Sequence, residues 1–281
     1  MTHANRMLIC TDLDRTLLPN GPQAESHGAR EAFKMLVGHD GARLAFVTGR
    51  HRALVEQAID EYDLPLPDFV IADVGASIYS VRDKEWFLWR EWQQKLAGDW
   101  RQHQAGDLRQ LLADLGELTP QEEEKQGIFK LSYYTSVDPH TEDPVIQINR
   151  RLSDAAIKVH VIQSIDETRN IGLIDILPAG ASKLHAISFL ASRTGYVMDD
   201  CFFAGDSGND LAVLTSPMQA ILVANATARV RAQAVRLSEE QGTRDSLYLA
   251  QGGYRGMNGC YSAGILEGLV YFRPKLDAWI P

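Results

Sequence analysis

Short apolar runs and helix-like segments alternate between Met7 and Val74, and this alternation limits the possible folds more than any other feature of the sequence. A short apolar run bounded by turn-forming residues is typical of a buried strand, whereas apolar positions three or four residues apart indicate a helix. We expect strands over 7–13, 42–48 and 69–72, with helices over 24–37 and 51–62 between them. Strands joined by helices usually pair in parallel, so the sequence predicts a parallel sheet covered by helices.

The alternation breaks after Ser80 and resumes after Ile165. The segment between them contains several tryptophans, an acidic run at Glu122–Glu124 and strand-like stretches over 129–136 and 158–164 that flank a helix-like segment over 145–152. The first pattern then returns, with strands over 171–177, 201–205 and 220–224 and helices over 182–194, from 209, and over 261–272. We therefore expect an α/β core formed by residues 1–80 and 166–281, with a smaller α+β domain inserted over 81–165.

Composition excludes several classes of function. A net charge of −9 and a pI near 5.4 argue against nucleic acid or an anionic membrane as the main partner, because both require clustered Lys and Arg. No apolar run approaches the roughly 20 residues of a membrane helix, and the first residues do not resemble a secretion signal. The three cysteines are far apart and fit neither a disulfide framework nor a zinc site. We expect a cytoplasmic protein that acts on a small molecule.

Asp12 and Asp14 follow the first predicted strand. In an open α/β sheet, ligands bind beyond the carboxyl ends of the strands. A carboxylate at that position can attack phosphorus when a metal offsets the repulsion between the two anions. Asp12 is the candidate nucleophile, and Asp14 is placed to act as general acid and then as general base. Taken alone, the pair is equally well explained as a turn at a strand end.

Two further groups fit a phosphoryl site. Thr48, Gly49 and Arg50 close the second predicted strand and offer a hydroxyl, free backbone N–H groups and a cation to phosphoryl oxygens. Lys183 opens a later helix and can supply a fixed positive charge to the transition state. Each is ordinary by itself, since Thr-Gly is common turn chemistry and a Lys at a helix start is usually solvated.

The segment Gly205–Asp210, with the sequence GDSGND, follows another predicted strand. Mg²⁺ prefers oxygen ligands and keeps several waters, so one or two carboxylates near the phosphate are sufficient. Asp206 is the candidate direct ligand and Asp210 lies behind it, with Asn209 beside the substrate. Either Asp alone is also explained as a helix cap. The order of the four motifs, each at a predicted strand end or helix start, is what supports a single site.

These motifs resemble those of the haloacid dehalogenase superfamily: DLDRT is similar to its first motif, VTGR to its second, Lys183 to its third and GDSGND to its fourth. The resemblance implies a Rossmann-like core with a parallel sheet. An α+β insert between the second and third motifs is similar to the type IIB, Cof-like cap, which acts on sugar phosphates. Within this branch the stretches AGDSGNDLAVL, FKLSYY and YSAGILEGLVYF resemble sucrose-phosphate phosphatases.

This resemblance implies hydrolysis of sucrose 6-phosphate with Mg²⁺ as cofactor. It assigns Asp12 as nucleophile, Asp14 as acid/base, and Thr48 and Lys183 to the phosphoryl group. The metal would be held by Asp12, the Asp14 carbonyl, Asp206 and Asp210. Two residues depart from the pattern: Arg15 stands where relatives often have Gly or Asn, and Leu184 stands where they commonly have Gly.

The inserted domain is expected to recognise the sugar. Lys130 and Ser132 should share one face of a strand and Tyr133 the other, because side chains alternate along a strand. Lys130 and Ser132 are therefore candidate substrate contacts, although a packed Tyr133 beside a solvated Lys130 fits the pattern equally well. The tryptophans are better explained as a seal between a helix and its sheet than as a sugar-stacking surface.

Other activities share this sequence pattern. The substrate can instead be mannosylfructose-phosphate, mannosylglycerate-phosphate or glucosylglycerol-phosphate, or the phosphoryl group can return to a sugar, as in a mutase. A catalytically silent subunit that binds a phosphosugar for a synthase is a different class of function. The intact Asp12, Asp14, Lys183 and Asp206 argue against that class. We also expect the protein to be a monomer. A sugar-phosphate synthase is the partner protein to test for association.

Overall fold

The computed structural model describes residues 6–137, 143–166 and 169–280. The expected core range includes residues 1–5, 167–168 and 281, and the expected insert includes 138–142, so these parts of both domains lie outside the described residues. Among the described residues, no helix combines the length and apolar character needed to cross a bilayer.

An eight-stranded sheet forms the larger part of the protein, in the order β12-β11-β10-β1-β2-β3-β4-β5. The strands from β12 to β3 pair in parallel, and β4 and β5 add an antiparallel edge. Their bounds are β1 (Met7–Thr11), β2 (Ala42–Val47), β3 (Phe69–Ala72), β4 (Ser77–Arg82), β5 (Glu85–Leu88), β10 (Cys201–Gly205), β11 (Gln219–Leu222) and β12 (Leu247–Leu249). The predicted α/β fold with a mainly parallel sheet is confirmed.

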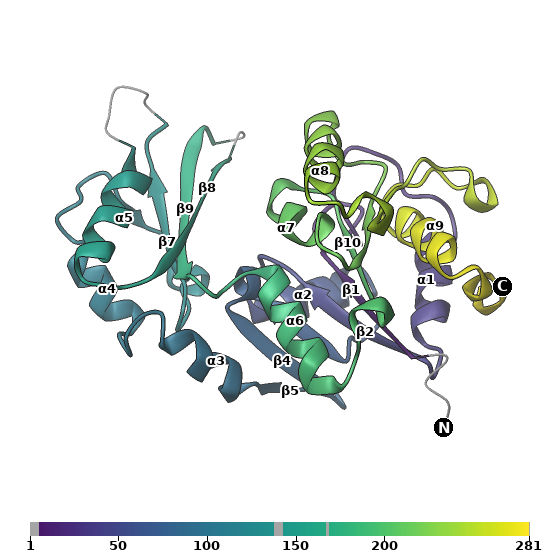
Figure 1. The fold of residues 1–281 in the computed structure, drawn as a ribbon, viewed down its shortest axis with the longest axis horizontal. Helices are drawn as coiled ribbons and strands as arrows, with labels where there is room; N and C mark the ends of the chain where they lie inside the picture. The colour runs from purple at the N-terminus through teal and green to yellow at the C-terminus, as the bar shows by residue number, and fades with distance from the viewer. Residues whose placement is uncertain (1–5, 138–142, 167–168, 281) are drawn as a thin grey trace.

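Helices cover both faces of this sheet (Figure 1). Within β1, Leu8 and Cys10 pack in one hydrophobic cluster, and Met7 and Ile9 pack in the other, as strand alternation requires. The first cluster includes α6 (Lys183–Thr194), α7 (Leu211–Leu214) and α8 (Ala228–Glu240); the second includes α1 (Ala29–Val37), α2 (Arg52–Glu61) and α9 (Ser262–Phe272). Burial on both faces explains why the central strands are continuously apolar.

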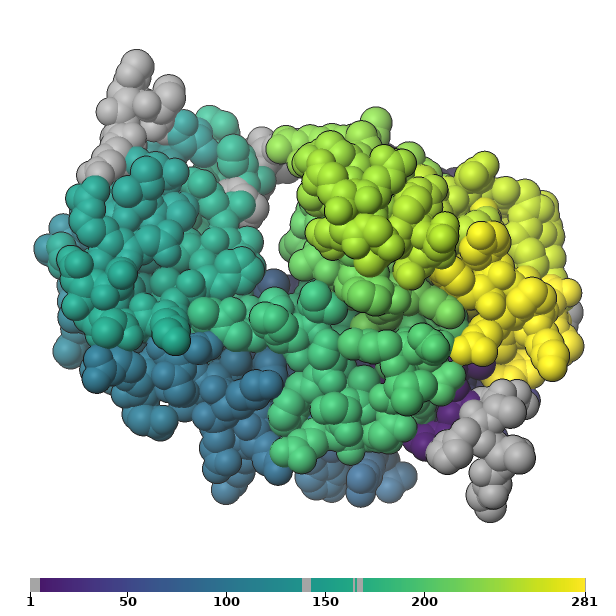
Figure 2. Space-filling view, viewed as in Figure 1, coloured from purple at the N-terminus to yellow at the C-terminus, as the bar shows by residue number. Residues whose placement is uncertain are grey.

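A four-stranded antiparallel sheet forms the smaller unit, in the order β6-β7-β9-β8. Its elements are α3 (Arg90–Ala97), α4 (Ala105–Leu111), β6 (Thr119–Pro120), β7 (Leu131–Thr135), α5 (Pro144–Asp154), β8 (Val159–Asp166) and β9 (Ile171–Pro178). Trp92 and Trp100 are fully buried. Trp100 packs on Phe129 of the small unit, as expected, whereas Trp92 packs on Phe189 of the core helix α6. In Figure 2 a deep notch separates this unit from the region around α7 and α8.

Two expected elements differ from the structure. The helix expected over 24–37 begins only at Ala29, because Gly28 precedes it with a left-handed φ of 74°. The strand over 171–177 was expected in the core, but as β9 it pairs with β7 and β8 of the small sheet. Its alternation of buried and half-buried residues suits an antiparallel sheet with one covered face.

The β4–β5 hairpin extends the large sheet beyond Ser80, where the sequence pattern was expected to leave the core. Its turn uses Asp83 and Lys84 at φ 51° and 66° instead of glycine, so the hairpin has no usual sequence signal. From sheet membership we propose that the inserted domain spans 89–178 rather than 81–165.

Candidate active site

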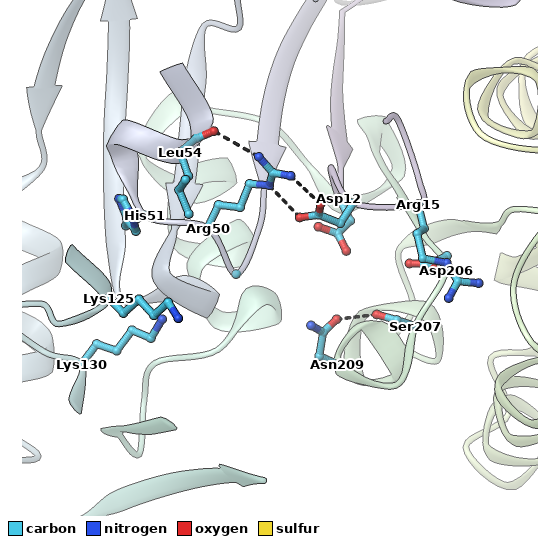
Figure 3. A pocket seen from close by; sticks show the side chains of 12 residues that line it. Asp12, Arg15, Arg50, His51, Leu54, Lys125, Lys130, Asp206, Ser207 and Asn209 are labelled. Atoms are coloured by element: carbon cyan, nitrogen blue, oxygen red, sulfur yellow. Dashed lines mark hydrogen bonds and ion pairs between the residues drawn. The ribbon is translucent and has the colours of Figure 1, made fainter. Parts of the chain in front are cut away.

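The strand order brings the four motifs to one edge of the large sheet. Because β1 lies between β10 and β2, the loops that follow these three strands meet at their shared carboxyl ends. These loops contain Asp12 and Asp14, Thr48 to Arg50, and Asp206 to Asp210, and the first residue of α6 is Lys183. Figure 3 shows the resulting cleft, with residues of the small unit facing those of the core.

Lys183 links two carboxylates at the bottom of this cleft. Its Nζ lies 3.1 Å from Asp12 Oδ2 and 2.7 Å from Asp210 Oδ1, and it donates to Asn209 Oδ1 at 3.2 Å. All three charged side chains are buried. Burial alone would lower the pKa of Lys183, but the contacts with Asp12 and Asp210 outweigh it and raise that pKa. The ammonium group is therefore permanent and fixed in place.

Asp12 is held in one orientation. Its Oδ1 accepts a hydrogen bond from the Leu13 N–H at 2.7 Å, while Oδ2 faces Lys183. Burial raises the pKa of Asp12 to about 7, against the lowering effect of Lys183 and with a further rise from Asp210. A carboxylate must be ionised to act as a nucleophile, and a cation beside Asp12 would favour the ionised form.

Asp12, Asp206 and Asp210 form a buried acidic cluster, in which one oxygen of each lies within 4.8 Å of the others. Burial and the charge of Asp210 raise the pKa of Asp206 to about 6. Such crowded carboxylates match the oxygen donors that Mg²⁺ prefers, so the residues fit this cofactor.

Asp210 is the most restrained member of this cluster. Its Oδ1 contacts Lys183, and its Oδ2 accepts hydrogen bonds from the N–H groups of Asp206 and Ser207 at 3.1 and 3.0 Å. These contacts occupy both carboxylate oxygens, so Asp210 fixes the shape of the 206–210 loop. The carboxylate oxygens of Asp12 and Asp206 are freer to act as metal ligands.

The carboxylate of Asp14 lies outside the acidic cluster. Arg50 binds it through two hydrogen bonds, with Nε 2.8 Å from Oδ2 and Nη2 2.7 Å from Oδ1, and Asn20 donates to Oδ1 at 2.7 Å. Burial opposes ionisation, but the hydrogen bonds from Arg50 lower the pKa of Asp14. Asp14 is thus held as a carboxylate, the state required of a base.

Among the other predicted site residues, two lie beneath the cleft surface. Thr48 is fully buried, and its Oγ1 accepts a hydrogen bond from the Arg50 N–H at 3.1 Å. Ser132 is also buried, and its Oγ donates to Asp175 Oδ1 at 2.5 Å and contacts the Lys125 carbonyl at 3.1 Å. Their predicted contacts with substrate therefore stay predictions.

Two adjoining hollows flank the acidic cluster. One, of about 380 Å³, is lined by Asp12, Asp14, Arg50 and Lys130 together with His51 and Lys125. The other, of about 690 Å³, is lined by Lys183 and by His160, Gln163 and Asp175 of the small sheet. Gly49, Ser207 and Asn209 line both hollows. The cleft therefore offers more space than a phosphate group needs.

Sequence reasoning missed Lys125 as a site residue. It follows a run of glutamates, a pattern typical of a solvated surface, and only the fold of the small unit turns its side chain toward the cleft beside Lys130 (Figure 3). His51 and the small-sheet residues of the second hollow had no distinguishing pattern. Their positions depend on how the two sheets face each other.

Comparison with known proteins assigns the chain to a family. The sequence model of the sucrose-6F-phosphate phosphohydrolase family matches residues 5–273. The chain belongs to the sucrose-6F-phosphate phosphohydrolase family. It is a phosphoric monoester hydrolase of the haloacid dehalogenase superfamily, as the motifs predicted.

Similar proteins agree with this family. The chain is 50% identical to a putative HAD-like hydrolase of Nitrosococcus oceani, over 98% of the chain and 74% of that protein. It is 27% identical to mannosylfructose-phosphate phosphatase of Agrobacterium fabrum, over 78% of the chain and 83% of the relative. It also matches the fold of sucrose-phosphatase from Synechocystis sp. PCC6803 with a TM-score of 0.73, at 24% identity, covering 95% of this chain and 98% of that one.

Proposed function

We propose that this phosphohydrolase is Mg²⁺-dependent and hydrolyses sucrose 6-phosphate through an aspartyl-phosphate on Asp12. The observation on which the mechanism rests is the arrangement of Asp12, which is oriented by the Leu13 N–H and faces Lys183 at 3.1 Å beside the acidic cluster. The family match supports the choice of sugar phosphate.

In the first step a carboxylate oxygen of Asp12 attacks phosphorus, and the bond between phosphorus and the sugar oxygen breaks. The departing oxygen takes a proton from Asp14. In the second step Asp14 removes a proton from water, which attacks the aspartyl-phosphate and releases phosphate, so Asp12 is regenerated. Mg²⁺ bound by Asp12 and Asp206 would supply charge neutralisation for the phosphoryl group.

Arg50 controls whether Asp14 carries the proton that the first step requires. An acid must carry a proton, yet the two hydrogen bonds from Arg50 favour the carboxylate form of Asp14. A substrate phosphate entering the hollow gives Arg50 a second anionic partner of matching geometry. Transfer of Arg50 toward the phosphate would free Asp14 to take up the proton that it donates to the leaving sugar.

The space around the cluster supports a disaccharide as the leaving group. Hollows of about 380 and 690 Å³ meet at Gly49, Ser207 and Asn209, and the first presents Lys125 and Lys130 while the second presents Asp175. Charged and amide groups of this kind bind hydroxyl groups. The resemblance to mannosylfructose-phosphate phosphatase favours a second candidate substrate of similar size.

Phosphate release from a panel of sugar phosphates, with Mg²⁺ and with chelator, tests the proposal. We expect strong Mg²⁺-dependent activity on sucrose 6-phosphate and little on monosaccharide phosphates. Asp12→Asn should lower kcat by more than roughly 10⁴-fold without unfolding the protein. A preference for mannosylfructose-phosphate would change the assigned substrate but not the mechanism. Full activity of Asp12→Asn would refute the mechanism.

A further inference from the structure

Arg15 lies beside the acidic cluster in a backbone conformation that disfavours most residues. Its φ is 57°, in the left-handed region where glycine and asparagine are most at ease. The structure holds this conformation from both sides: the Arg15 N–H donates to Asn20 Oδ1 at 2.8 Å, and its carbonyl accepts from Asn225 Nδ2 at 2.6 Å. A strained residue that its surroundings hold so firmly is often part of a functional site.

Asn225 ties this conformation to the core of the protein. The residue is 4% exposed, and its Oδ1 accepts a hydrogen bond from the Tyr261 N–H at 2.9 Å, just before α9. The direction of the Arg15 side chain therefore follows from a rigid support and not from a free loop.

The Arg15 side chain is directed at the third carboxylate of the acidic cluster. Lys183 contacts Asp12 and Asp210. Arg15 Nε lies 3.4 Å from Asp206 Oδ2, and Figure 3 shows these two residues at the cleft. That Nε is buried and makes no hydrogen bond to the residues that the structure describes, and the guanidinium also contacts the Asn225 carbonyl at 3.4 Å. The contact with Asp206 is thus electrostatic and loose, which suits a partner that is exchanged.

We infer that Arg15 is a built-in counter-cation for Asp206 that competes with Mg²⁺ and lowers the metal affinity of the substrate-free enzyme. This inference rests on the metal site of the proposed function. A divalent ion bound at the buried Asp206 carboxylate would lie close to the guanidinium, and the two positive charges would repel each other. Arg15 must then leave Asp206, and its side chain, 39% exposed, has room to turn toward the cleft that it lines.

Mg²⁺ affinity measured by isothermal titration calorimetry, without substrate, tests this role. Arg15→Gln removes the charge but keeps an unbranched side chain at the same φ, and we expect its Kd for Mg²⁺ to fall about tenfold, equivalent to about 1.4 kcal/mol. Arg15→Lys keeps the charge and should stay near the wild-type Kd. Arg52→Gln changes the net charge equally but removes a cation paired with Glu56 in α2, so its Kd should not change.

Equal Kd values for the wild type and Arg15→Gln would overturn the inference and leave the proposed function intact. A tenfold fall in Arg15→Lys as well would also overturn it, because charge would not be the cause. Absence of Mg²⁺ binding in both the wild type and Arg15→Gln would refute the metal site itself and the inference with it. Circular dichroism of each variant verifies that the fold is retained.

Discussion

Replacing Asp206 with Asn should stabilise the metal-free protein above pH 7, although it removes a predicted metal ligand. Burial, together with Asp210, raises the pKa of Asp206 from 3.8 to about 6. The folded state therefore holds this proton at pH values where the unfolded chain has lost it. The stability of the protein falls as pH rises through the window from about 4 to about 6.

The size of the effect follows from this pKa shift. A shift of about two units corresponds to about 3 kcal/mol of lost stability once Asp206 is ionised. An amide of nearly the same shape carries no charge and avoids this cost. The pKa of about 6 already includes the lowering effect of Arg15, so the loss of that contact needs no separate correction. We expect Asp206→Asn to be about 3 kcal/mol more stable than the wild type at pH 8 in chelator.

Urea unfolding in chelator at pH 8 and pH 4 measures this difference, which should nearly vanish at pH 4. Asp114→Asn is the matched control: Arg151 lowers the pKa of Asp114, so this change should bring no gain at pH 8. Mg²⁺ at 100 times its Kd should add about 2.7 kcal/mol to the wild type and much less to Asp206→Asn. A variant less stable than the wild type at pH 8 would refute the raised pKa of Asp206 as a cost to stability.

Three other changes probe separate parts of the site. Lys183→Met leaves two buried carboxylates uncompensated and should cost about 3–5 kcal/mol in urea unfolding; a loss below about 1 kcal/mol would contradict the buried network. Arg50→Gln should raise the pKa of Asp14 and move the acid limb of aspartyl-phosphate hydrolysis to higher pH, and an unmoved limb in a pH series would exclude that link. Gly75→Ala places a Cβ 2.4 Å from backbone atoms at φ 101° and should cost about 3 kcal/mol or more by thermal unfolding. Gly106→Ala, in open space within α4, should instead gain about 0.5–1 kcal/mol, and similar results for the two alanines would disprove the steric argument.

The sequence contained enough information to predict the core because its strands are buried on both faces. Such strands appear as continuous apolar runs, and polar motifs at their ends must then meet at one edge of the sheet. Asp12, Lys183, Asp206 and Asp210 do come together in this way. The order of the motifs along the chain was thus sufficient to predict that these residues form one cluster.

Other features depend on contacts between distant segments. The pairing of β9 with β7 and β8 cannot be read from its own residues, since apolar alternation does not say which sheet a strand joins. The hydrogen bonds between Arg50 and Asp14 depend on the side-chain directions of two separate loops. Lys125 enters the cleft only because the small unit faces the core.

A turn after β3 explains how Lys183 is positioned so accurately at the junction of the two units. Asp73, Val74 and Gly75 all have positive φ values, of 53°, 57° and 101°, which is costly for a β-branched valine. The Val74 N–H donates to the Thr48 carbonyl at 3.0 Å, while Gly75 packs directly against the backbone that begins α6.

The Gly75 carbonyl, in turn, accepts a hydrogen bond from Trp92 Nε1 of α3 at 2.9 Å. The same strained turn therefore contacts the second motif, the helix that starts with Lys183 and the first helix of the small unit. A rigid support of this kind fixes the ammonium group relative to Asp12. Accurate placement matters, because a displacement of about 1 Å at a reacting centre can reduce the rate about a hundredfold. We attribute the strained backbone at 73–75 to its role in holding Lys183 at a fixed position relative to Asp12.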